Sequence, residues 1–388
     1  MPNLANHETA VRDFSSVDEL RRGLEAKANF EAVDLYPRDG SEVLGQVEDR
    51  VAHLARVGTG QALAYNTGMA AVTDAIDLAL ERSTSDSGLP TLACAEETYS
   101  QTKRYIENFV RDSRARIVYF DSGDRGDINR VLEEHEPEVI VAETVSNYID
   151  VPVLDTDNLI DKVRDAEAVT APRPVLILDN TLPLSTAEPL GERLREDDQI
   201  IVVESGTKSY SFNTELLGIA YTANPQVLDL LRRLRRCRGT LPGLASLERI
   251  REVIPDGLES FDERNLRLFR STGDIAVRLF EAADGNTDFH VAHPGLPNHD
   301  NHEYYAQRYP DGASPVLYIQ SFKFNQYQVA EKLWAHPGVQ EQARLGQSFG
   351  FDHTRIVADE NVGAVRIAGG AETDGQALGE ACAEALYG

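Results

Sequence analysis

The sequence feature that most constrains the fold is an alternation, between residues 61 and 225, of short apolar runs with amphipathic stretches. Each apolar run is rich in β-branched residues and ends at polar ones, and the runs are TLACA, ARIVYF, EVIVAET, PVLILDN and QIIVVES. Such runs, separated by helical patterns, are typical of a parallel sheet wrapped by helices. Ligands of these sheets bind at the carboxyl ends of the strands. We therefore expect the functional residues just after these runs.

The flanking segments predict an arm and a second domain. Residues 1–60 are polar and mostly helical in pattern, with a break at YPRDG. From about residue 226 an arginine-rich helix and a further helical stretch precede the strand-like segments FHVAHPG, SPVLYIQSF and GAVRIAG. This order is typical of a smaller α+β domain built on an antiparallel sheet. We expect an arm and helix at residues 1–60, a large domain at 61–250 and a small domain at 251–388.

The charge of the chain excludes several classes of partner. It carries 64 Asp and Glu residues against 38 Lys and Arg, a formal net charge of −26 at pH 7. Such a charge repels nucleic acid and anionic membranes, so we expect neither as a partner. The first residues lack the cationic start and apolar run of a secretory signal, and no stretch resembles a membrane span. We expect a soluble, cytoplasmic protein.

Cysteine and histidine give no sign of a disulfide framework or a metal site. The three cysteines, Cys94, Cys237 and Cys382, are far apart and form no CxxC motif. The histidines of the carboxyl-terminal part lack the compact spacing of metal ligands; they include His293, His299, His302 and His353. We expect no bound metal.

Three of the predicted loops carry residues suited to one kind of chemistry. Asp179 ends a strongly apolar run, where a carboxylate is costly unless a cation such as a protonated pyridine nitrogen meets it. Lys208 follows the next run beside Ser205 and Thr207, where desolvation lowers an amine's pKa and favours attack on an aldehyde. Residues 66–69 begin a helix, whose free amides suit a phosphate. Singly, each has an ordinary alternative such as a helix cap or a solvated loop. Their order, a phosphate turn, then an aspartate, then a lysine about thirty residues later, resembles that of fold-type I enzymes that use pyridoxal 5′-phosphate (PLP).

The sequence resembles the Cys/Met-metabolism family of PLP enzymes, the group of cystathionine γ-synthase, cystathionine lyase and methionine γ-lyase, over most of the chain. The matching segments are YPRDG (36–40), NTGMAA (66–71), EETYSQT (96–102), VAETVSN (141–147), LDNT (178–181), ESGTK (204–208), VAHPGLP (291–297), QSFG (347–350) and AVRIAGGAE (364–372). The resemblance implies an α/β, fold-type I PLP-dependent transferase fold, with a large mostly parallel seven-stranded sheet domain and a smaller C-terminal α+β domain.

The resemblance also implies roles for individual residues. Lys208 would carry PLP as a Schiff base and act as a general base, while Asp179 would hold the pyridine nitrogen protonated. The other implied cofactor contacts are Asn147 at the phenolate oxygen, Tyr99 stacked on the ring and assisting proton transfer, and Gly68, Met69, Ser205 and Thr207 around the phosphate. Arg366, helped by Ser348, would bind the substrate α-carboxylate. Tyr36 and Arg38 would reach the phosphate of a neighbouring subunit, which implies a homodimer or homotetramer.

The departures from the family pattern lie around the substrate. Ser100 and Gln101 follow the stacking tyrosine, so the cysteine of methionine γ-lyases is absent and methionine is disfavoured as substrate. After the lysine, SFNTELLG replaces the usual Gly-His-Ser-Asp. The implied activity is γ- or β-elimination or replacement on cystathionine, an O-acylhomoserine or an unusual γ-substituted or γ-halogenated amino acid. An aminotransferase or decarboxylase on the same fold is one alternative. A non-catalytic PLP-fold binding protein is another, although so many costly charges argue against it.

Overall fold

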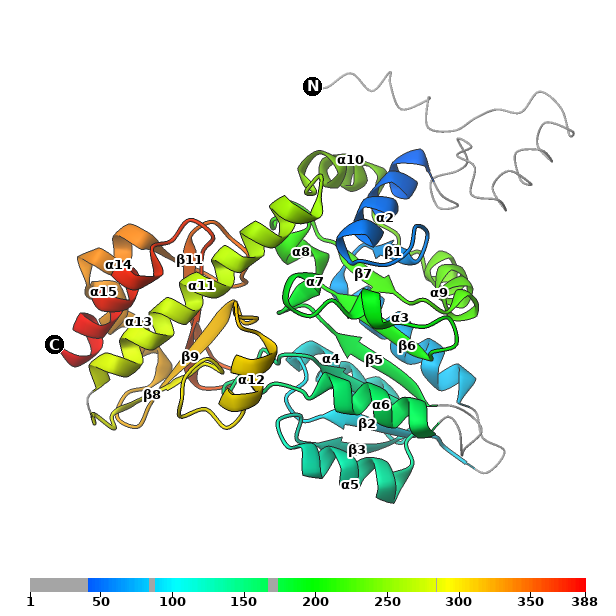
Figure 1. The fold of residues 1–388 in the computed structure, drawn as a ribbon, viewed down its shortest axis with the longest axis horizontal. Coiled ribbons are helices and arrows are strands. Elements are labelled where there is room, and N and C mark those ends of the chain that lie inside the picture. The colour runs from blue at the N-terminus through cyan, green and yellow to red at the C-terminus, as the bar shows by residue number, and fades with distance from the viewer. Residues whose placement is uncertain (1–40, 84–87, 167–173, 284) are drawn as a thin grey trace, which may run out of the picture.

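Two β-sheets organise the protein, as the ribbon of the computed structural model shows (Figure 1). The structure describes residues 41–83, 88–166, 174–283 and 285–388. The first sheet has seven strands in the order β1-β7-β6-β5-β4-β2-β3, and the second has five in the order β10-β11-β12-β9-β8. The predicted combination of a large, mostly parallel sheet with a smaller second one is therefore confirmed.

The five apolar runs all form neighbouring parallel strands of the large sheet. They are β2 (Thr91–Ala95), β3 (Arg116–Phe120), β4 (Val139–Glu143), β5 (Val175–Asp179) and β6 (Ile200–Glu204). Two antiparallel strands extend the β6 side, β7 (Gly218–Tyr221) and then β1 (Ala62–Tyr65). Because the five central strands run in one direction, the polar residues after β4, β5 and β6 meet at one edge of the sheet.

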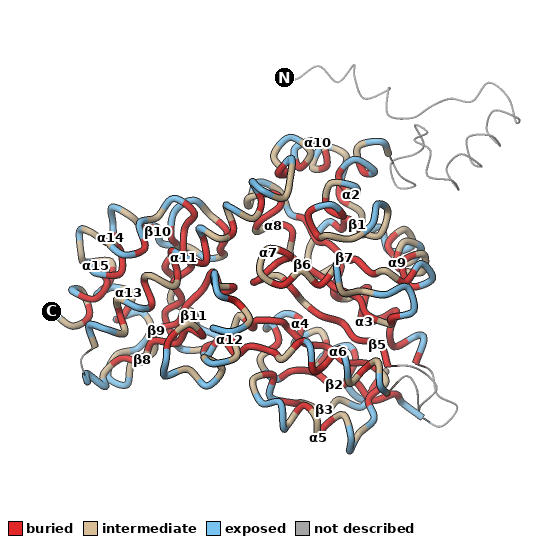
Figure 2. The backbone as a smooth tube through the Cα atoms, viewed as in Figure 1, coloured by how far each residue is buried: buried red, intermediate tan, exposed pale blue. Residues whose placement is uncertain are grey.

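Helices cover both faces of the large sheet, which is why its strands are apolar along most of their length. One face packs against α2 (Glu42–Leu54), α5 (Arg125–His135), α6 (Thr156–Ala166) and α10 (Leu244–Val253). The other packs against α3 (Gly68–Arg82), α9 (Pro225–Arg238) and the short π-helix η3 (Ile106–Val110), which continues α4 (Ser100–Tyr105). Shorter segments are α7 (Leu184–Ala187), the 3-10 turn η4 (Leu190–Arg193) and α8 (Gly206–Ser209). Figure 2 shows the strands buried and the outer faces of the helices exposed.

The small sheet is antiparallel except for its β10–β11 pair. Its strands are β8 (Phe289–Ala292), β9 (Val316–Ser321), β10 (Ala343–Leu345), β11 (Thr354–Asp359) and β12 (Ala364–Ala368). The helices α13 (Gln326–Ala335), α14 (Pro337–Gln342) and α15 (Gly375–Tyr387) pack on this sheet with part of α11 (Leu258–Ala283), and α12 (His302–Arg308) lies nearer the large sheet.

The long helix α11 runs from beside α10 to the helices of the small sheet (Figure 1). Ile275 and Leu279 of α11 belong to the same apolar cluster as β12 and α15, whereas Phe261 near its start belongs to the large-sheet core. One continuous helix therefore contributes to both cores. The domain limits at residues 60 and 250 stay predictions. Among the described residues, no helix combines the length and apolar character that crossing a bilayer requires.

A glycine sets the distance between β7 and the start of α3. A Cβ atom at Gly218 would lie 1.9 Å from the backbone oxygen of Thr67, the residue that caps α3. Real Cβ atoms do not approach a backbone atom so closely, so only glycine fits there. The glycine thereby holds the loop of residues 66–68 against the sheet.

Replacing this glycine tests how far that loop can yield. We expect Gly218→Ala to lower the free energy of unfolding by roughly 1–3 kcal/mol, because an added methyl group meets backbone rather than a flexible side chain. Gly273→Ala is the matched control: nothing lies within 4 Å of a Cβ added there, inside α11. It should raise stability by about 0.5–1 kcal/mol, since alanine favours helix. Urea unfolding followed by circular dichroism measures both, and equal stabilities for the two variants would contradict this account.

Candidate active site

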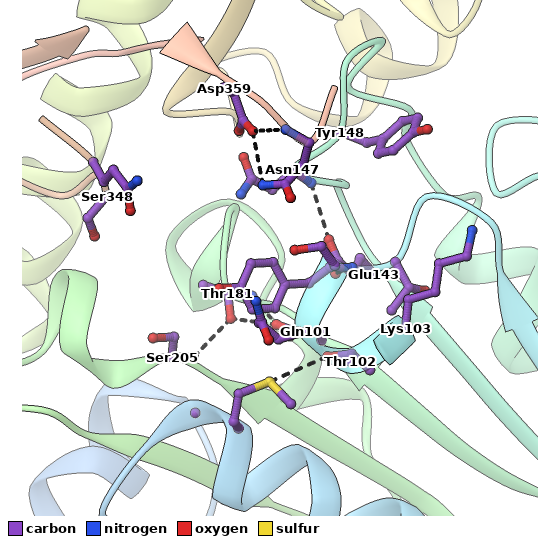
Figure 3. Close-up of a pocket in the computed structure, with 18 of the residues that line it drawn as sticks. Gln101, Thr102, Lys103, Glu143, Asn147, Tyr148, Thr181, Ser205, Ser348 and Asp359 are labelled. Atoms are coloured by element: carbon purple, nitrogen blue, oxygen red, sulfur yellow. Dashed lines mark hydrogen bonds between the residues drawn. The ribbon is translucent and has the colours of Figure 1, made fainter. Parts of the chain in front are cut away.

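A cavity of about 1120 Å³ lies at the carboxyl ends of β4, β5 and β6, where the two sheets meet. Its wall includes all of the predicted site residues that the structure describes: Gly68, Met69, Tyr99, Asn147, Asp179, Ser205, Thr207, Lys208, Ser348 and Arg366. Tyr36 and Arg38 lie outside the described residues. Figure 3 shows labelled side chains from both sheets facing this space, with Ser205, Thr181 and Glu143 from the large sheet and Ser348 and Asp359 from the other side.

Lys208 lies in α8, the short turn that follows β6, and its amine projects toward Ser348, in the loop between β10 and β11. Nζ donates a hydrogen bond to Ser348 Oγ at 2.6 Å. Burial, and after it the positive charge of Arg366, lowers the pKa of Lys208 to about 8. A sizeable fraction of the amine is therefore neutral in mildly alkaline solution, which is the form that attacks an aldehyde. Ser348, predicted as a partner of Arg366, here contacts the lysine.

Asp179, the last residue of β5, has a carboxylate oxygen, Oδ2, that accepts no hydrogen bond from the described residues. Both hydrogen bonds that it accepts within the described residues come from Thr181, from N at 3.0 Å and from Oγ1 at 2.5 Å, and both go to Oδ1. Burial raises the pKa of Asp179, although the Thr181 bonds act against the rise. A cation or an N–H donor at Oδ2 would relieve this cost. That is the chemistry of a protonated ring nitrogen.

Glu143, the last residue of β4, is a site residue that the sequence interpretation missed. Its carboxylate is 4% exposed and accepts the backbone N–H groups of Tyr99 at 2.5 Å and of Asn147 at 3.2 Å. It thereby fixes the backbone of two predicted cofactor contacts, and Figure 3 shows its bond to Asn147. Burial, followed by the charge of Asp179, raises the pKa of Glu143. The signal that identified Asp179, an acid ending an apolar run, was equally present here.

The start of α3 and the end of β6 form the wall predicted to hold a phosphate. Thr67 Oγ1 caps the helix by accepting from Ala70 N at 3.0 Å, and the first turn holds no acidic residue. Gly68 approaches Ser205 so closely that a Cβ would lie 3.2 Å from the serine Cα. Helix amides without an acidic neighbour suit an anion. The Thr207 hydroxyl donates to the backbone oxygen of Leu217 and accepts from its N–H group, so it is less available than the Ser205 hydroxyl to bind a phosphate.

Arg366 of β12 supplies a cation from the small sheet. It is 8% exposed, its Nη1 donates a long bond of 3.4 Å to Asn147 Oδ1, and its buried Nε has no hydrogen-bond partner among the described residues. Tyr318 donates to the same Asn147 oxygen at 3.0 Å, which leaves the Asn147 amide nitrogen to act as a donor. A buried guanidinium with unsatisfied donors is stabilised by a carboxylate. Together with the amine, Asp179 and the helix start, this set fits a phosphorylated pyridine aldehyde and an amino acid.

A further buried carboxylate stands behind the cavity wall. Glu204 ends β6 and is 1% exposed. It accepts hydrogen bonds from Tyr210 at 2.7 Å, Tyr221 at 2.9 Å and Asn180 at 3.2 Å. Asn180 directly follows Asp179, and Tyr210 lies just beyond Lys208, so one carboxylate ties together the two loops that carry them. Burial raises the pKa of Glu204 to about 7, although the three hydrogen bonds oppose the rise.

Comparisons with known proteins agree on one family. The family model described as Cys/Met metabolism PLP-dependent enzyme matches residues 8–350. Cystathionine beta-lyase of Saccharomyces cerevisiae is 23% identical over 199 residues, which are 50% of this chain and 41% of that protein. The chain thus matches less than half the length of this curated relative. Within the described ranges, no group of three or more His, Cys, Asp or Glu side chains is placed to hold a metal ion.

Solved structures share the fold at low identity. A putative O-acetylhomoserine (thiol)-lyase of Campylobacter jejuni, solved with a pyridoxyl-lysine phosphate, has a TM-score of 0.73 and 17% identity, with 97% of this chain and 93% of that chain covered. Cystathionine gamma synthase of Xanthomonas oryzae has a TM-score of 0.69 and 18% identity, with 91% and 88% covered. These likenesses confirm the fold.

The ionisation of Glu204 makes stability depend on pH. A carboxyl whose pKa is higher in the folded than in the unfolded state favours folding while protonated, and that contribution is lost as pH rises from about 4.3 to about 7. Glu204→Gln stays neutral, so its free energy of unfolding should rise relative to the parent by on the order of 2 kcal/mol between pH 5 and pH 8. Urea unfolding at both pH values measures this. Exposed Glu331→Gln is the control, and a pH-independent difference for Glu204→Gln would rule the account out.

Proposed function

The chain belongs to the Cys/Met metabolism PLP-dependent enzyme family, and on that premise we propose that it eliminates or replaces a substituent at Cγ or Cβ of a small amino acid. The observation that supports this most is that one cavity holds an amine, Lys208, a carboxylate with a spare oxygen, Asp179, and an unsatisfied guanidinium, Arg366. These are the groups that such a reaction needs for cofactor attachment, ring polarisation and substrate orientation.

PLP, when bound, supplies an electron-withdrawing ring that makes the Cα proton of an amino acid acidic. Lys208 would hold the cofactor covalently through Nζ. Burial and the charge of Arg366 lower the pKa of this amine to about 8, so Nζ would be able to accept the Cα proton of a substrate and to return one. In γ-chemistry a second proton leaves Cβ before the γ-substituent departs, and Lys208 or Tyr99 would accept it.

The remaining residues would bind and orient. Asp179 Oδ2 would accept a hydrogen bond from the ring nitrogen, the Asn147 amide would donate to the phenolate oxygen, and Tyr99 would cover one face of the ring. The amides of Gly68 and Met69 with the Ser205 hydroxyl would bind the phosphate.

The outer part of the cavity bears on the choice of substrate. Arg366 would bind the α-carboxylate through its planar guanidinium, which directs the substrate side chain toward the outer wall. That wall includes the polar side chains of Gln101, Lys103, Tyr148 and Asp359 (Figure 3). A polar leaving group fits this lining better than a thioether methyl group. We propose cystathionine, an O-acylhomoserine or another γ-substituted amino acid as the substrate class.

The oligomeric state is part of the same proposal. Tyr36 and Arg38, in the arm of residues 1–60, would reach the phosphate site of a neighbouring subunit, as the family resemblance implies. The active unit would then be a homodimer or a homotetramer of such dimers, with the large domain at residues 61–250 and the small domain at 251–388.

Removal of the proposed attachment point tests the cofactor chemistry. Lys208→Ala should lack the yellow absorption band near ~420 nm that lysine-bound PLP gives, because the other lysine of the described cavity wall, Lys103, donates its amine to the backbone oxygen of Glu96 at 2.9 Å. Lys162→Ala, which changes a half-buried lysine paired with Glu133 outside the cavity wall, is the control and should keep the band. Absorption spectra of the purified proteins measure both. An unchanged band in Lys208→Ala would refute the assignment.

A substrate panel tests the reaction itself. Incubation with γ- and β-substituted amino acids should release ammonia and a 2-keto acid, or form a new amino acid when a thiol is added, and Lys208→Ala should be inactive in parallel. Mass spectrometry and ammonia assays identify the products. Conversion of the cofactor to pyridoxamine phosphate during turnover would instead indicate aminotransfer, and inactivity on every compound of the panel would reject the elimination proposal.

A further inference from the structure

Two consecutive residues between α8 and β7 hold an unfavourable backbone conformation close to Lys208. Phe212 and Asn213 have φ angles of 50° and 59°, in the left-handed region. Asparagine visits this region more readily than most residues, but phenylalanine does so rarely. Non-glycine residues persist there only where surrounding contacts hold them, and such positions cluster at functional sites. Both lie in the SFNTELLG segment, which departs from the family pattern.

Contacts with α11 and with the loop of residues 347–350 hold this pair. The guanidinium of Arg264, on α11, lies 4.3 Å from the Phe212 ring centroid and donates from Nη2 to the backbone oxygen of Gly350 at 3.1 Å. Gly350 in turn is so close to Lys208 that a Cβ would lie 2.5 Å from the lysine backbone oxygen. The 211–214 segment, α11 and the 347–350 loop therefore meet directly beside the lysine.

Asn213 forms hydrogen bonds through its backbone N–H and through both polar atoms of its side chain within this meeting point. Its backbone N–H donates to Thr207 O at 2.7 Å, and its Nδ2 donates to Phe349 O at 3.0 Å. Its Oδ1 accepts the hydroxyl proton of Ser348, with a distance of 3.2 Å. Ser348 is itself left-handed, with φ of 75°. The asparagine thus bonds both the backbone before Lys208 and the loop that carries Ser348.

The direction of these bonds decides what Ser348 presents to Lys208. A serine hydroxyl has one proton and two lone pairs. Because the proton points to Asn213 Oδ1, the Ser348 oxygen can only accept from Lys208 Nζ, 2.6 Å away. An acceptor at this position favours the ammonium form of Lys208, because all three positions on its nitrogen are N–H donors, whereas the neutral amine has a lone pair at one of them.

We propose that Asn213 is a positioning residue that orients the Ser348 hydroxyl as an acceptor for Lys208 and so keeps the free amine more basic than burial alone would leave it. The proposal deepens the proposed function, because it concerns the lysine to which the cofactor would attach. It acts on the amine of the chain itself, before any cofactor is bound.

Other charges also face Lys208 and must stay constant in a test. Arg366 of β12 lowers its pKa, and Asp179 of β5, Glu143 of β4 and Tyr99 line the same cavity. None of them contacts Asn213 through a bond in the described structure. Substitutions at residue 213 therefore leave these groups in place.

The test measures the basicity of Lys208 without relying on PLP. The full-length protein is freed of cofactor and labelled with trace acetic anhydride from pH 6 to pH 10, and mass spectrometry of the Lys208 peptide gives the pH midpoint of its reactivity. The parent should show a midpoint near 8. Asn213→Ala and Asn213→Gly should lower it by ~0.5–1 unit, because the hydroxyl is no longer held as an acceptor. Asn213→Asp should raise it, because a carboxylate is placed near the ammonium group.

The matched control and a double variant separate positioning from loss of structure. Asn325→Ala removes an asparagine that caps α13, at a comparable cost in stability, and should leave the midpoint unchanged. In a Ser348→Ala background, Asn213→Gly should have no further effect, since the group it orients is gone.

Three results would overturn the proposal. One is a parent-like midpoint in Asn213→Gly, which keeps the left-handed backbone but lacks the amide. Another is a shift of equal size in Asn325→Ala, and the last is additive shifts in the double variant. Each of these can be distinguished from failure of the proposed function, which leaves the labelling of Lys208 intact but abolishes product formation from every amino acid.

Discussion

Three carboxylates are buried at one edge of the large sheet, and the arrangement of the surrounding loops depends on supplying them with hydrogen-bond donors. Glu143, Asp179 and Glu204 end three neighbouring parallel strands, where apolar side chains from both faces exclude water. Each carboxylate is costly there, and each is met by a particular set of donors: backbone N–H groups for the first, a threonine for the second, two tyrosines and an asparagine for the third. Of these three carboxylates, Asp179 alone keeps an oxygen that accepts no hydrogen bond from the described residues, and it lines the cavity that also holds Lys208.

Positive charge reaches this edge from two directions. Lys208 comes from the turn after β6 of the large sheet, but Arg366 comes from β12 of the small sheet, and the positive charge of Arg366 adds to burial in lowering the pKa of Lys208. Their coexistence in one cavity is favourable when anions lie between them. The carboxylate and phosphate groups of the proposed ligands are such anions. The positive charges of Lys208 and Arg366 are therefore better compensated with such ligands bound than without them.

The sequence carried enough information for the sheet and for the core of the site. The β-branched runs were long and regular enough to predict β2 to β6, and the residues after them included Asp179 and Lys208. Motif resemblance added Tyr99, Asn147 and Arg366. Sequence spacing alone does not connect these three residues, because they lie on separate elements of the fold. All of them line one cavity. The roles of these residues and the domain limits stay predictions, and the arm with Tyr36 and Arg38 lies outside the described residues.

What the sequence could not give were the contacts made across the boundary between the two sheets. Ser348 was matched to Arg366 by motif, yet its hydroxyl lies against Lys208, next to a meeting of segments in which residues 212, 213 and 348 are left-handed. Backbone dihedrals of this kind depend on tertiary contacts such as that of Arg264 with Phe212, which local pattern does not encode.

The shared cavity wall has a consequence for biogenesis. A chain whose parallel sheet has formed, but whose second sheet has not yet docked, presents Lys208 in an open crevice without the enclosure that lowers its pKa. Its amine is then an ordinary protonated surface lysine, slow to react with carbonyl compounds. Reactivity of this amine toward aldehydes therefore depends on the second sheet being docked against the first.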